Sequence, residues 1–285
     1  MRTFILGLGA QKSATTWLFR QLIKSPDFAR GFSKEYHLFN AIHLSSEKRA
    51  MSHIVRRINN YPFHDGDNFV EKHERIMLDF YSTPDKYYDY FDSILDEGQF
   101  TLDITPSYSG LSSEVLKEIR REFELRGIQL KVVFFLREPI CRVESAVKMG
   151  LRRSNVLREV SLEVMTQKLR NWINSKDDLL RANYREIVAR IDGAFNQEEV
   201  YFGFYETLFS ASEVHRLSTF LGLPESLIDP GKKVNATPSL FRYTEVDMDD
   251  FRDKVADRYE FVSSRFGFDL SIWHRATEAI TIGAK

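Results

Sequence analysis

One lysine and three hydroxyl side chains follow directly on a short apolar run near the start of the chain. The run Phe4–Leu8 ends at Gly9, and the polar residues that follow are Lys12, Ser13, Thr15 and Thr16. Where a buried strand of an α/β sheet passes into a helix, the helix start offers unpaired N–H groups and the positive end of its dipole. The pattern predicts a phosphate-binding loop, with a solvated lysine and capping threonines as the alternative.

Two common phosphate-binding patterns do not fit this loop. The nucleoside-triphosphate pattern G-x-x-x-x-G-K-[ST] requires a second glycine where the chain has Gln11. The dinucleotide pattern G-x-G-x-x-G fails because Gly7 and Gly9 are followed by Lys12 at the third glycine position. A P-loop kinase acting on a small molecule, with magnesium-dependent ATP turnover, therefore remains only an alternative.

A second group of residues could bind another phosphate. Arg137 ends the near-continuous apolar stretch Leu130–Leu136, and Pro139 suits the first turn of the next helix. Ser145 then lies about 9 Å further along that helix. An arginine fork and a hydroxyl can share one phosphate. The alternative is that Arg137 pairs with a carboxylate and Ser145 packs between helices.

These residues must be positioned by alternating strands and helices. We predict strands over 3–9, 100–104, 130–136 and 199–204, and helices over 14–24, 114–126, from 139, within 161–191, and over 210–221 and 247–266. Such alternation is typical of an α/β fold, here a P-loop-like (Rossmann-like) core with a parallel sheet of about four to five strands and helical insertions. The chain lacks a repeat or linker, so we expect a single domain over 1–285.

Composition excludes several classes of protein. Forty basic and forty-one acidic residues give 285 residues a formal charge of −1, so no global field attracts nucleic acid or anionic lipid. The single cysteine, Cys141, excludes an internal disulfide framework. The opening apolar run is too short for the core of a signal peptide. We therefore expect a cytoplasmic protein without a membrane anchor.

The first loop carries a family resemblance. Residues 11–18, Gln-Lys-Ser-Ala-Thr-Thr-Trp-Leu, resemble the 5′-phosphosulfate-binding loop of sulfotransferases that use 3′-phosphoadenosine-5′-phosphosulfate (PAPS). Gln11 and Ala14 depart from the usual loop, and Ala14 still leaves the backbone approachable. The segment around Arg137 is similar to the family's 3′-phosphate motif, L-R-[DE]-P-x-x-R-x-x-S, with Val147 in place of an aromatic residue.

Weaker similarities follow in the same order as in the family. Residues 34–39, Lys-Glu-Tyr-His-Leu-Phe, look like the K-E-x-H-x-F segment of glycan-type and bacterial members, which include the heparan sulfate enzymes. Residues 103–108, 205–208 and 220–224 resemble later segments. Residues of about 40–95 match nothing and are expected to form an insertion on the acceptor side.

The resemblance implies in-line transfer of a sulfuryl group from PAPS to a hydroxyl or amine of a small molecule or carbohydrate, without a metal. Lys12 would offset the charge that grows on the bridging oxygen. The implied nucleotide-binding residues are Lys12, Ser13, Ala14, Thr15, Thr16, Trp17, Arg137, Ser145 and Lys233. A nucleotide-binding module that has lost its transfer chemistry is the alternative outside the enzymes.

The resemblance leaves the catalytic base open between two residues. Glu35 corresponds to the base of the glycan-type members, and His37 corresponds to the histidine of the cytosolic small-molecule members. In an extended segment both side chains would point the same way. Asp103 is a candidate neighbour that could raise the pKa of Glu35. Trp17 either stacks on adenine or packs its helix against the sheet, and Lys233 belongs to a loosely matching basic loop. The sequence does not identify the acceptor or the oligomeric state.

Overall fold

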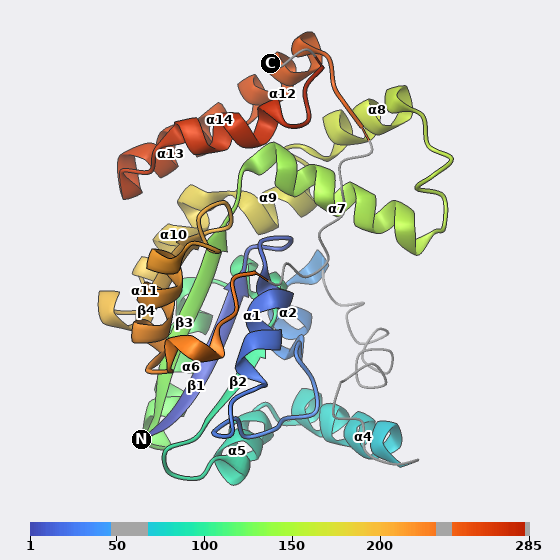
Figure 1. The fold of residues 1–285 in the computed structure, drawn as a ribbon. Helices are drawn as coiled ribbons and strands as arrows, with labels where there is room; N and C mark the ends of the chain where they lie inside the picture. The colour runs from blue at the N-terminus through green and yellow to red at the C-terminus, as the bar shows by residue number, and fades with distance from the viewer. Residues whose placement is uncertain (47–67, 232–240, 283–285) are drawn as a thin grey trace.

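A computed structural model describes residues 1–46, 68–231 and 241–282. Its centre is a four-stranded parallel sheet in the order β2-β1-β3-β4 (Figure 1). The strands are β1 (Arg2–Gly9), β2 (Phe100–Ile104), β3 (Ile128–Leu136) and β4 (Val200–Phe204). The predicted α/β class and its parallel sheet are thereby confirmed.

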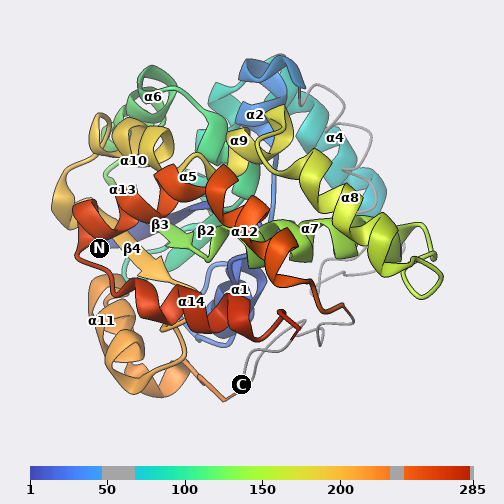
Figure 2. The same ribbon diagram turned by 90° about the horizontal axis from the view of Figure 1, so that it is seen from above.

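Helices cover both faces of the sheet. The described α-helices are α1 (Thr15–Leu22), α2 (Leu38–His43), α4 (Phe69–Ser82), α5 (Asp85–Ile94), α6 (Ser113–Leu125), α7 (Pro139–Arg153), α8 (Leu162–Trp172), α9 (Lys176–Ala182), α10 (Tyr184–Asp192), α11 (Ala211–Leu221), α12 (Glu245–Lys254), α13 (Ala256–Phe266) and α14 (Leu270–Glu278). Figures 1 and 2 show α1 and α11 on one face and α5, α6 and α10 on the other. This double cover explains why the central strands β1 and β3 are almost continuously apolar.

The carboxyl ends of the strands lie beneath a second layer of helices. Helix α7 crosses above these ends, and α12, α13 and α14 lie beside and above it (Figures 1 and 2). Ligands of open α/β sheets bind at this end of the strands. The two predicted phosphate sites both lie there, after β1 and after β3.

The edge of the sheet at β2 is covered by another part of the chain, and one carbonyl on the edge at β4 is bonded to a side chain. A chain segment runs beside β2, where Ala29 N–H donates to Phe100 O at 2.8 Å and Ile104 N–H donates to Lys34 O at 2.9 Å. On the other edge, Arg216 Nη2 donates to Phe202 O of β4 at 2.8 Å. The β2 contact also fixes the segment that continues into residues 35–37.

Part of the predicted insertion belongs to the core. Helix α5 packs against β1, where the Phe91 and Phe4 ring centroids lie 4.8 Å apart at an interplanar angle of 72°. Phe4 also stacks on Phe123 of α6 at 4.1 Å. Residues 47–67 of this stretch lie outside the described residues.

Two predicted helical stretches are divided in the structure. The single helix expected over 247–266 is wrong, because α12 and α13 meet at Val255, which is fully buried and has φ −120°. Residues 161–191 form three helices, since Ser175 and Asn183 cap new helix starts with their side chains. Each break lets the following helix bury its own apolar face.

We predict opposite effects of alanine at two glycines. A Cβ on Gly7 would lie 2.7 Å from Cγ2 of the fully buried Ile104, whereas a Cβ on Gly150 of α7 would meet nothing within 4 Å. Gly7→Ala should lower the free energy of unfolding by about 1–3 kcal/mol through overpacking. Gly150→Ala should raise it by about 0.5–1 kcal/mol through helix propensity. Urea unfolding measures both, and a Gly7→Ala protein as stable as the parent would contradict this packing.

Candidate active site

The loop between β1 and α1 has an unusual backbone. Lys12 (φ 72°) and Ala14 (φ 66°) lie in the left-handed region, and no side chain caps the start of α1. Within the described part of the chain, the N–H groups of Lys12, Ala14, Thr15 and Thr16 donate to no acceptor. Unpaired N–H groups at such a turn and at a helix start form anion sites. The loop therefore has the form of an anion cradle rather than of a side-chain-capped turn.

Among the described residues, one buried polar atom of Ser13 and one of Arg137 lack hydrogen-bond partners. Ser13 is fully buried and its Oγ is unpaired, and Nε of Arg137 is likewise buried and unpaired. Buried polar atoms are nearly always paired in folded proteins, so such exceptions call for an explanation. An anionic ligand with several acceptor oxygens would satisfy such atoms.

The structure brings the two predicted phosphate sites into contact. Arg137 Nη1 donates to the Lys12 carbonyl at 2.6 Å, and the guanidinium lies 4.2 Å above the Tyr205 ring centroid. Tyr184 fixes the backbone of Arg137, because its hydroxyl accepts from the N–H at 3.2 Å and donates to the carbonyl at 2.6 Å. The arginine that follows β3 is thus held directly beside the loop that follows β1.

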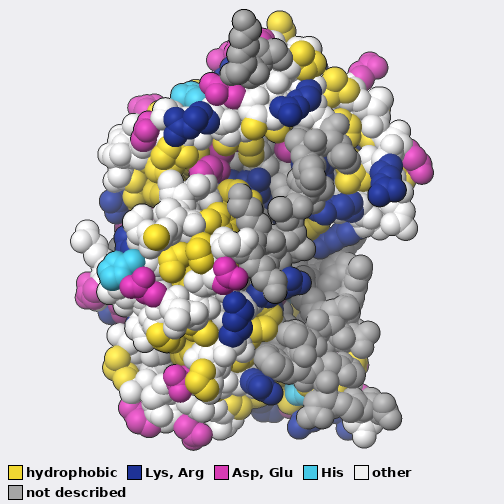
Figure 3. Space-filling view, viewed as in Figure 1, with side chains coloured by type: hydrophobic (Ala, Val, Ile, Leu, Met, Phe, Trp, Pro, Cys, Tyr) yellow, Lys and Arg dark blue, Asp and Glu magenta, His cyan; other side chains and the backbone are white. Residues whose placement is uncertain are grey.

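Helix α7 continues from Arg137 past the loop. Ser145 is half-buried on this helix, and Met149 Sδ lies 3.8 Å from the Lys12 Nζ. Burial lowers the pKa of Lys12 to about 8, with further lowering by the neighbouring charges of Arg152, Arg137, Arg153 and Lys148. Lys and Arg side chains also gather along the lower edge of the α7–α8 region in Figure 3. The surroundings of Lys12 are therefore strongly positive and favour an anion.

Arg142, which also falls in register with the 3′-phosphate motif, has a different place. Its side chain is fully buried and pairs with Asp178, which also pairs with Arg258 of α13 at 2.8 Å. This arginine joins α7, α9 and α13 to one another. Its contacts are those of a structural residue.

The two candidate bases, Glu35 and His37, lie side by side. His37 Nε2 is 3.1 Å from Glu35 Oε2, although the backbone at His37 (φ 54°) is left-handed rather than extended. Lys34 Nζ lies 2.6 Å from Glu35 Oε1 and 3.5 Å from Thr15 Oγ1. Lys34 thereby links the candidate base Glu35 to the anion loop. Lys34 was not among the predicted site residues, although it opens the K-E-x-H-x-F segment.

The charge of Glu35 is strongly influenced by these neighbours. Burial acts to raise its pKa, but the charge of Lys34 and the hydrogen bond from His37 outweigh burial and hold the pKa well below its usual range. The ring of His37 is almost fully buried, and its Nδ1 is without a partner in the described structure. With Lys34 in this position, Glu35 is ionised but weakly basic.

Asp103 does not act on Glu35 as expected. Its carboxylate accepts from the Tyr36 N–H at 3.3 Å and from three hydroxyls, those of Thr105 at 2.5 Å, Tyr108 at 2.8 Å and Tyr87 at 2.9 Å. Burial raises the pKa of Asp103. Because Tyr36 lies between the candidate bases, Asp103 fastens their segment to the end of β2.

Two predicted nucleotide-binding residues remain, Trp17 and Lys233. Trp17 is only 1% exposed, its Nε1 donates to Asp229 O at 3.3 Å, and its ring packs edge-on against Phe209 at 5.2 Å. These contacts correspond to the packing alternative. Lys233 lies outside the described residues.

The described ranges hold neither a metal-ligand cluster nor a helix that could cross a membrane. Across 1–46, 68–231 and 241–282, no three His, Cys, Asp or Glu side chains group as possible metal ligands. None of the helices in these same ranges combines the length and apolar character needed to cross a bilayer.

Comparison with solved structures identifies the fold. A sulfotransferase from Alicyclobacillus acidocaldarius is similar over 96% of this chain and 100% of its own, with a TM-score of 0.60 and 19% identity. The sulfotransferase domain of the Synechococcus PCC 7002 olefin synthase is similar over 94% of this chain and 95% of its own, with a TM-score of 0.49 and 16% identity. No family model matches the chain. No curated protein is similar to it in sequence. The chain thus has the sulfotransferase-type α/β fold.

We predict that Lys12 reacts unusually early with amine reagents. Its pKa of about 8 means that its free amine appears near pH 8, whereas exposed lysines need a pH near 10. Brief acetylation at pH 8, followed by peptide mass spectrometry, should label Lys12 ahead of Lys117, an exposed lysine on α6. Equal labelling of the two lysines across pH 7–10 would contradict the electrostatic environment described for the loop.

Proposed function

We propose that this protein binds PAPS and transfers its sulfuryl group to a hydroxyl or amine of an acceptor. The observation that carries the proposal is the hydrogen bond from Arg137 to the Lys12 carbonyl, which puts the two anion sites side by side. One nucleotide that carries a phosphosulfate at one end and a 3′-phosphate at the other could occupy both anion sites. The sulfotransferase-type fold supports the same conclusion.

Each end of the nucleotide would have its own residues. Lys12, Ser13 and the N–H groups of Ala14, Thr15 and Thr16 would hold the phosphosulfate, and Arg137 and Ser145 would hold the 3′-phosphate. With a pKa of about 8, Lys12 is mostly protonated at pH 7. Its charge would offset the negative charge that grows on the bridging oxygen as the sulfuryl group leaves.

Glu35 is the proposed base, and Lys34 would control it. An anion bound at Thr15 would compete for the Lys34 ammonium, which lies 3.5 Å from the Thr15 hydroxyl. Loss of the Lys34 contact would raise the pKa of Glu35 and make it a better proton acceptor. His37 is the second candidate for this role, and its contact with Glu35 also allows it to orient the carboxylate.

The partners and location are proposed from broader features. A small-molecule or carbohydrate acceptor, as for the bacterial and glycan-type members, suits the resemblance of residues 34–39. The formal charge of −1 argues against nucleic acid. We also propose a cytoplasmic location. The transfer would need no metal, because the charge of Lys12 and the dipole of helix α1 would take the place of magnesium.

We predict selective binding of adenosine 3′,5′-bisphosphate, the desulfated product of PAPS. At a hundred times its Kd this nucleotide should stabilise the folded protein by about 2.7 kcal/mol, seen as a rise in Tm. AMP and ATP with magnesium should give much smaller rises, and Arg137→Gln should remove the advantage of the bisphosphate. Equal rises for all three nucleotides would refute the 3′-phosphate site. A larger rise with magnesium ATP would favour a kinase.

We predict that Glu35→Gln lowers kcat by about 10²–10⁴-fold, because proton removal from the acceptor loses its base. Binding of adenosine 3′,5′-bisphosphate should be retained. The measurement is sulfate transfer from radiolabelled PAPS to a panel of hydroxyl and amine acceptors. If His37→Ala shows the large loss and Glu35→Gln a mild one, the two roles are exchanged. Binding without transfer to any acceptor would favour a silent nucleotide-binding module.

A further inference from the structure

Glu206 follows β4 and joins three parts of the molecule. Its Oε1 accepts from the Glu138 N–H at 2.9 Å, and its Oε2 accepts from the Trp273 Nε1–H at 2.9 Å. Glu138 is the neighbour of Arg137, and Trp273 belongs to α14. One buried carboxylate therefore connects the end of β4, the turn before α7 and the C-terminal helices.

The same turn is fastened from several sides. The Glu138 side chain accepts from the Ile140 N–H at 2.9 Å and from the Tyr259 hydroxyl at 2.6 Å. Tyr205, the residue before Glu206, lies beneath the Arg137 guanidinium. The position of Arg137 thus depends on contacts made behind it as well as on the Lys12 carbonyl.

We propose that Glu206 is a positioning residue for the nucleotide site: its ionised carboxylate holds the Arg137–Glu138 turn and ties it to α14. This inference rests on the proposed function, because it concerns the arginine assigned to the 3′-phosphate. Glu206 itself acts through the Glu138 N–H. The sequence analysis noted the segment 205–208 only as a weak similarity and gave it no role.

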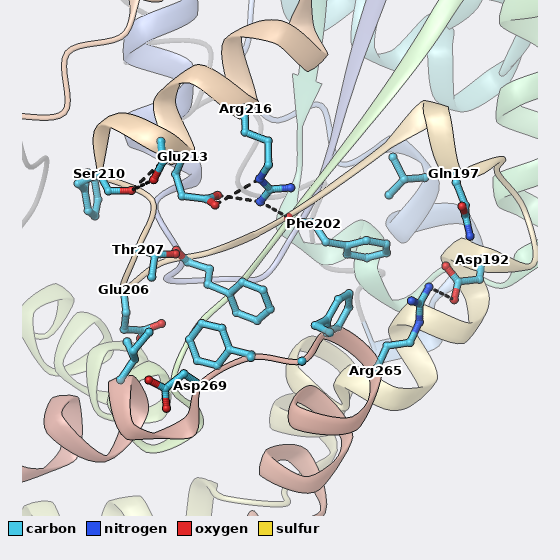
Figure 4. A pocket seen from close by; sticks show the side chains of 18 of the residues that line it. Asp192, Gln197, Phe202, Glu206, Thr207, Ser210, Glu213, Arg216, Arg265 and Asp269 are labelled. Carbon is cyan, nitrogen blue, oxygen red and sulfur yellow. Dashed lines mark hydrogen bonds and ion pairs between the residues drawn. The ribbon is translucent and has the colours of Figure 1, made fainter.

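The carboxylate can exchange protons with water through a groove. Glu206 lines a hollow of about 1360 Å³ bounded by β4, α11, α13 and α14, and Figure 4 shows it on the wall of that hollow. Burial raises the pKa of Glu206 to about 7. The charges of Arg137 and Glu138 act on it directly, and Tyr184 lies within its electrostatic reach. Tyr259 bonds to Glu138 and stacks on His274. The other charged residues that line the hollow are Asp192, Glu213, Arg216, Arg265, Asp269 and Arg275. The ionised form that accepts both hydrogen bonds therefore gains a proton near neutral pH.

Protonation would break this arrangement. A protonated carboxyl has one oxygen that donates, so it cannot accept freely from both the Glu138 and Trp273 N–H groups. Glu206→Gln has the same defect at every pH, because its amide nitrogen also donates. The glutamine variant should therefore behave like the parent protein below pH 7 and differ from it above.

The first experiment needs no nucleotide. The chain has three tryptophans, Trp17, Trp172 and Trp273, whose indole N–H signals can be resolved by NMR and assigned with Trp273→Phe. The Trp273 signal should shift with a midpoint near pH 7 in the parent protein and should not do so in Glu206→Gln. A signal that never shifts with pH, or that still shifts with pH in Glu206→Gln, overturns the assignment.

The second experiment measures Kd of adenosine 3′,5′-bisphosphate by calorimetry at pH 6 and pH 8.5. Protonation of the nucleotide's own phosphates cancels in the ratio of variant to parent. We expect Glu206→Gln to bind about ten-fold more weakly than the parent at pH 8.5, the effect of one hydrogen bond to a charged group, and equally at pH 6. A ratio that does not change with pH, or tighter binding by the variant at pH 8.5, overturns the proposal.

The matched control is Glu213→Gln. Glu213 lines the same groove but pairs with Arg216 at 2.7 Å and with the Tyr201 hydroxyl at 2.8 Å, away from the turn. The Glu213→Gln variant should show the same pH shift of the Trp273 signal and the same Kd as the parent protein. A change equal to that of Glu206→Gln would overturn the specific role of Glu206. If the parent protein does not bind the nucleotide, the proposed function fails, while the Trp273 titration still decides whether Glu206 holds α14.

Discussion

The proposed nucleotide site depends on the hydrogen bond between the Arg137 guanidinium and the Lys12 carbonyl. It is possible because β1 and β3 are adjacent parallel strands in which Gly9 pairs with Phe134. Lys12 and Arg137 each lie three residues beyond this pair, so the two strand–helix junctions reach the same height above the sheet. Sheet register, rather than either motif alone, makes one site out of two loops.

This geometry brings the positive charges of Lys12, Arg137 and the end of α7 close together, and they lower the pKa of Lys12. The lowered pKa of Lys12 arises from burial and from arginine and lysine neighbours, and the buried Ser13 Oγ and Arg137 Nε have no partners in the part of the chain that the structure describes. Each of these features costs free energy in the ligand-free protein. A polyanionic ligand would relieve all of them at once. The proposed anion site is therefore a place where the fold gives up stability.

Local patterns predicted much of the fold, because each depends on residues close in sequence. The four strands, the loop at Lys12 and the turn at Arg137 are of this kind. Contacts between distant segments could not be predicted in the same way. The binding of Asp103 to hydroxyls instead of to Glu35, and the break between α12 and α13 at Val255, are set by how segments pack on each other. Lys34 could have been noticed from its motif, but its contact with Thr15 required the fold.

The covered edges of the sheet have a consequence for the behaviour of the chain among its own copies. A bare edge strand is a template for pairing with another polypeptide and so for aggregation. Here the segment of residues 27–34 occupies the edge of β2, and the Arg216 guanidinium occupies a carbonyl on the edge of β4. A charged group bound to an edge carbonyl must be displaced and resolvated before a foreign strand can add. The β2 edge is thereby closed to a foreign strand, whereas at β4 the guanidinium blocks a single carbonyl.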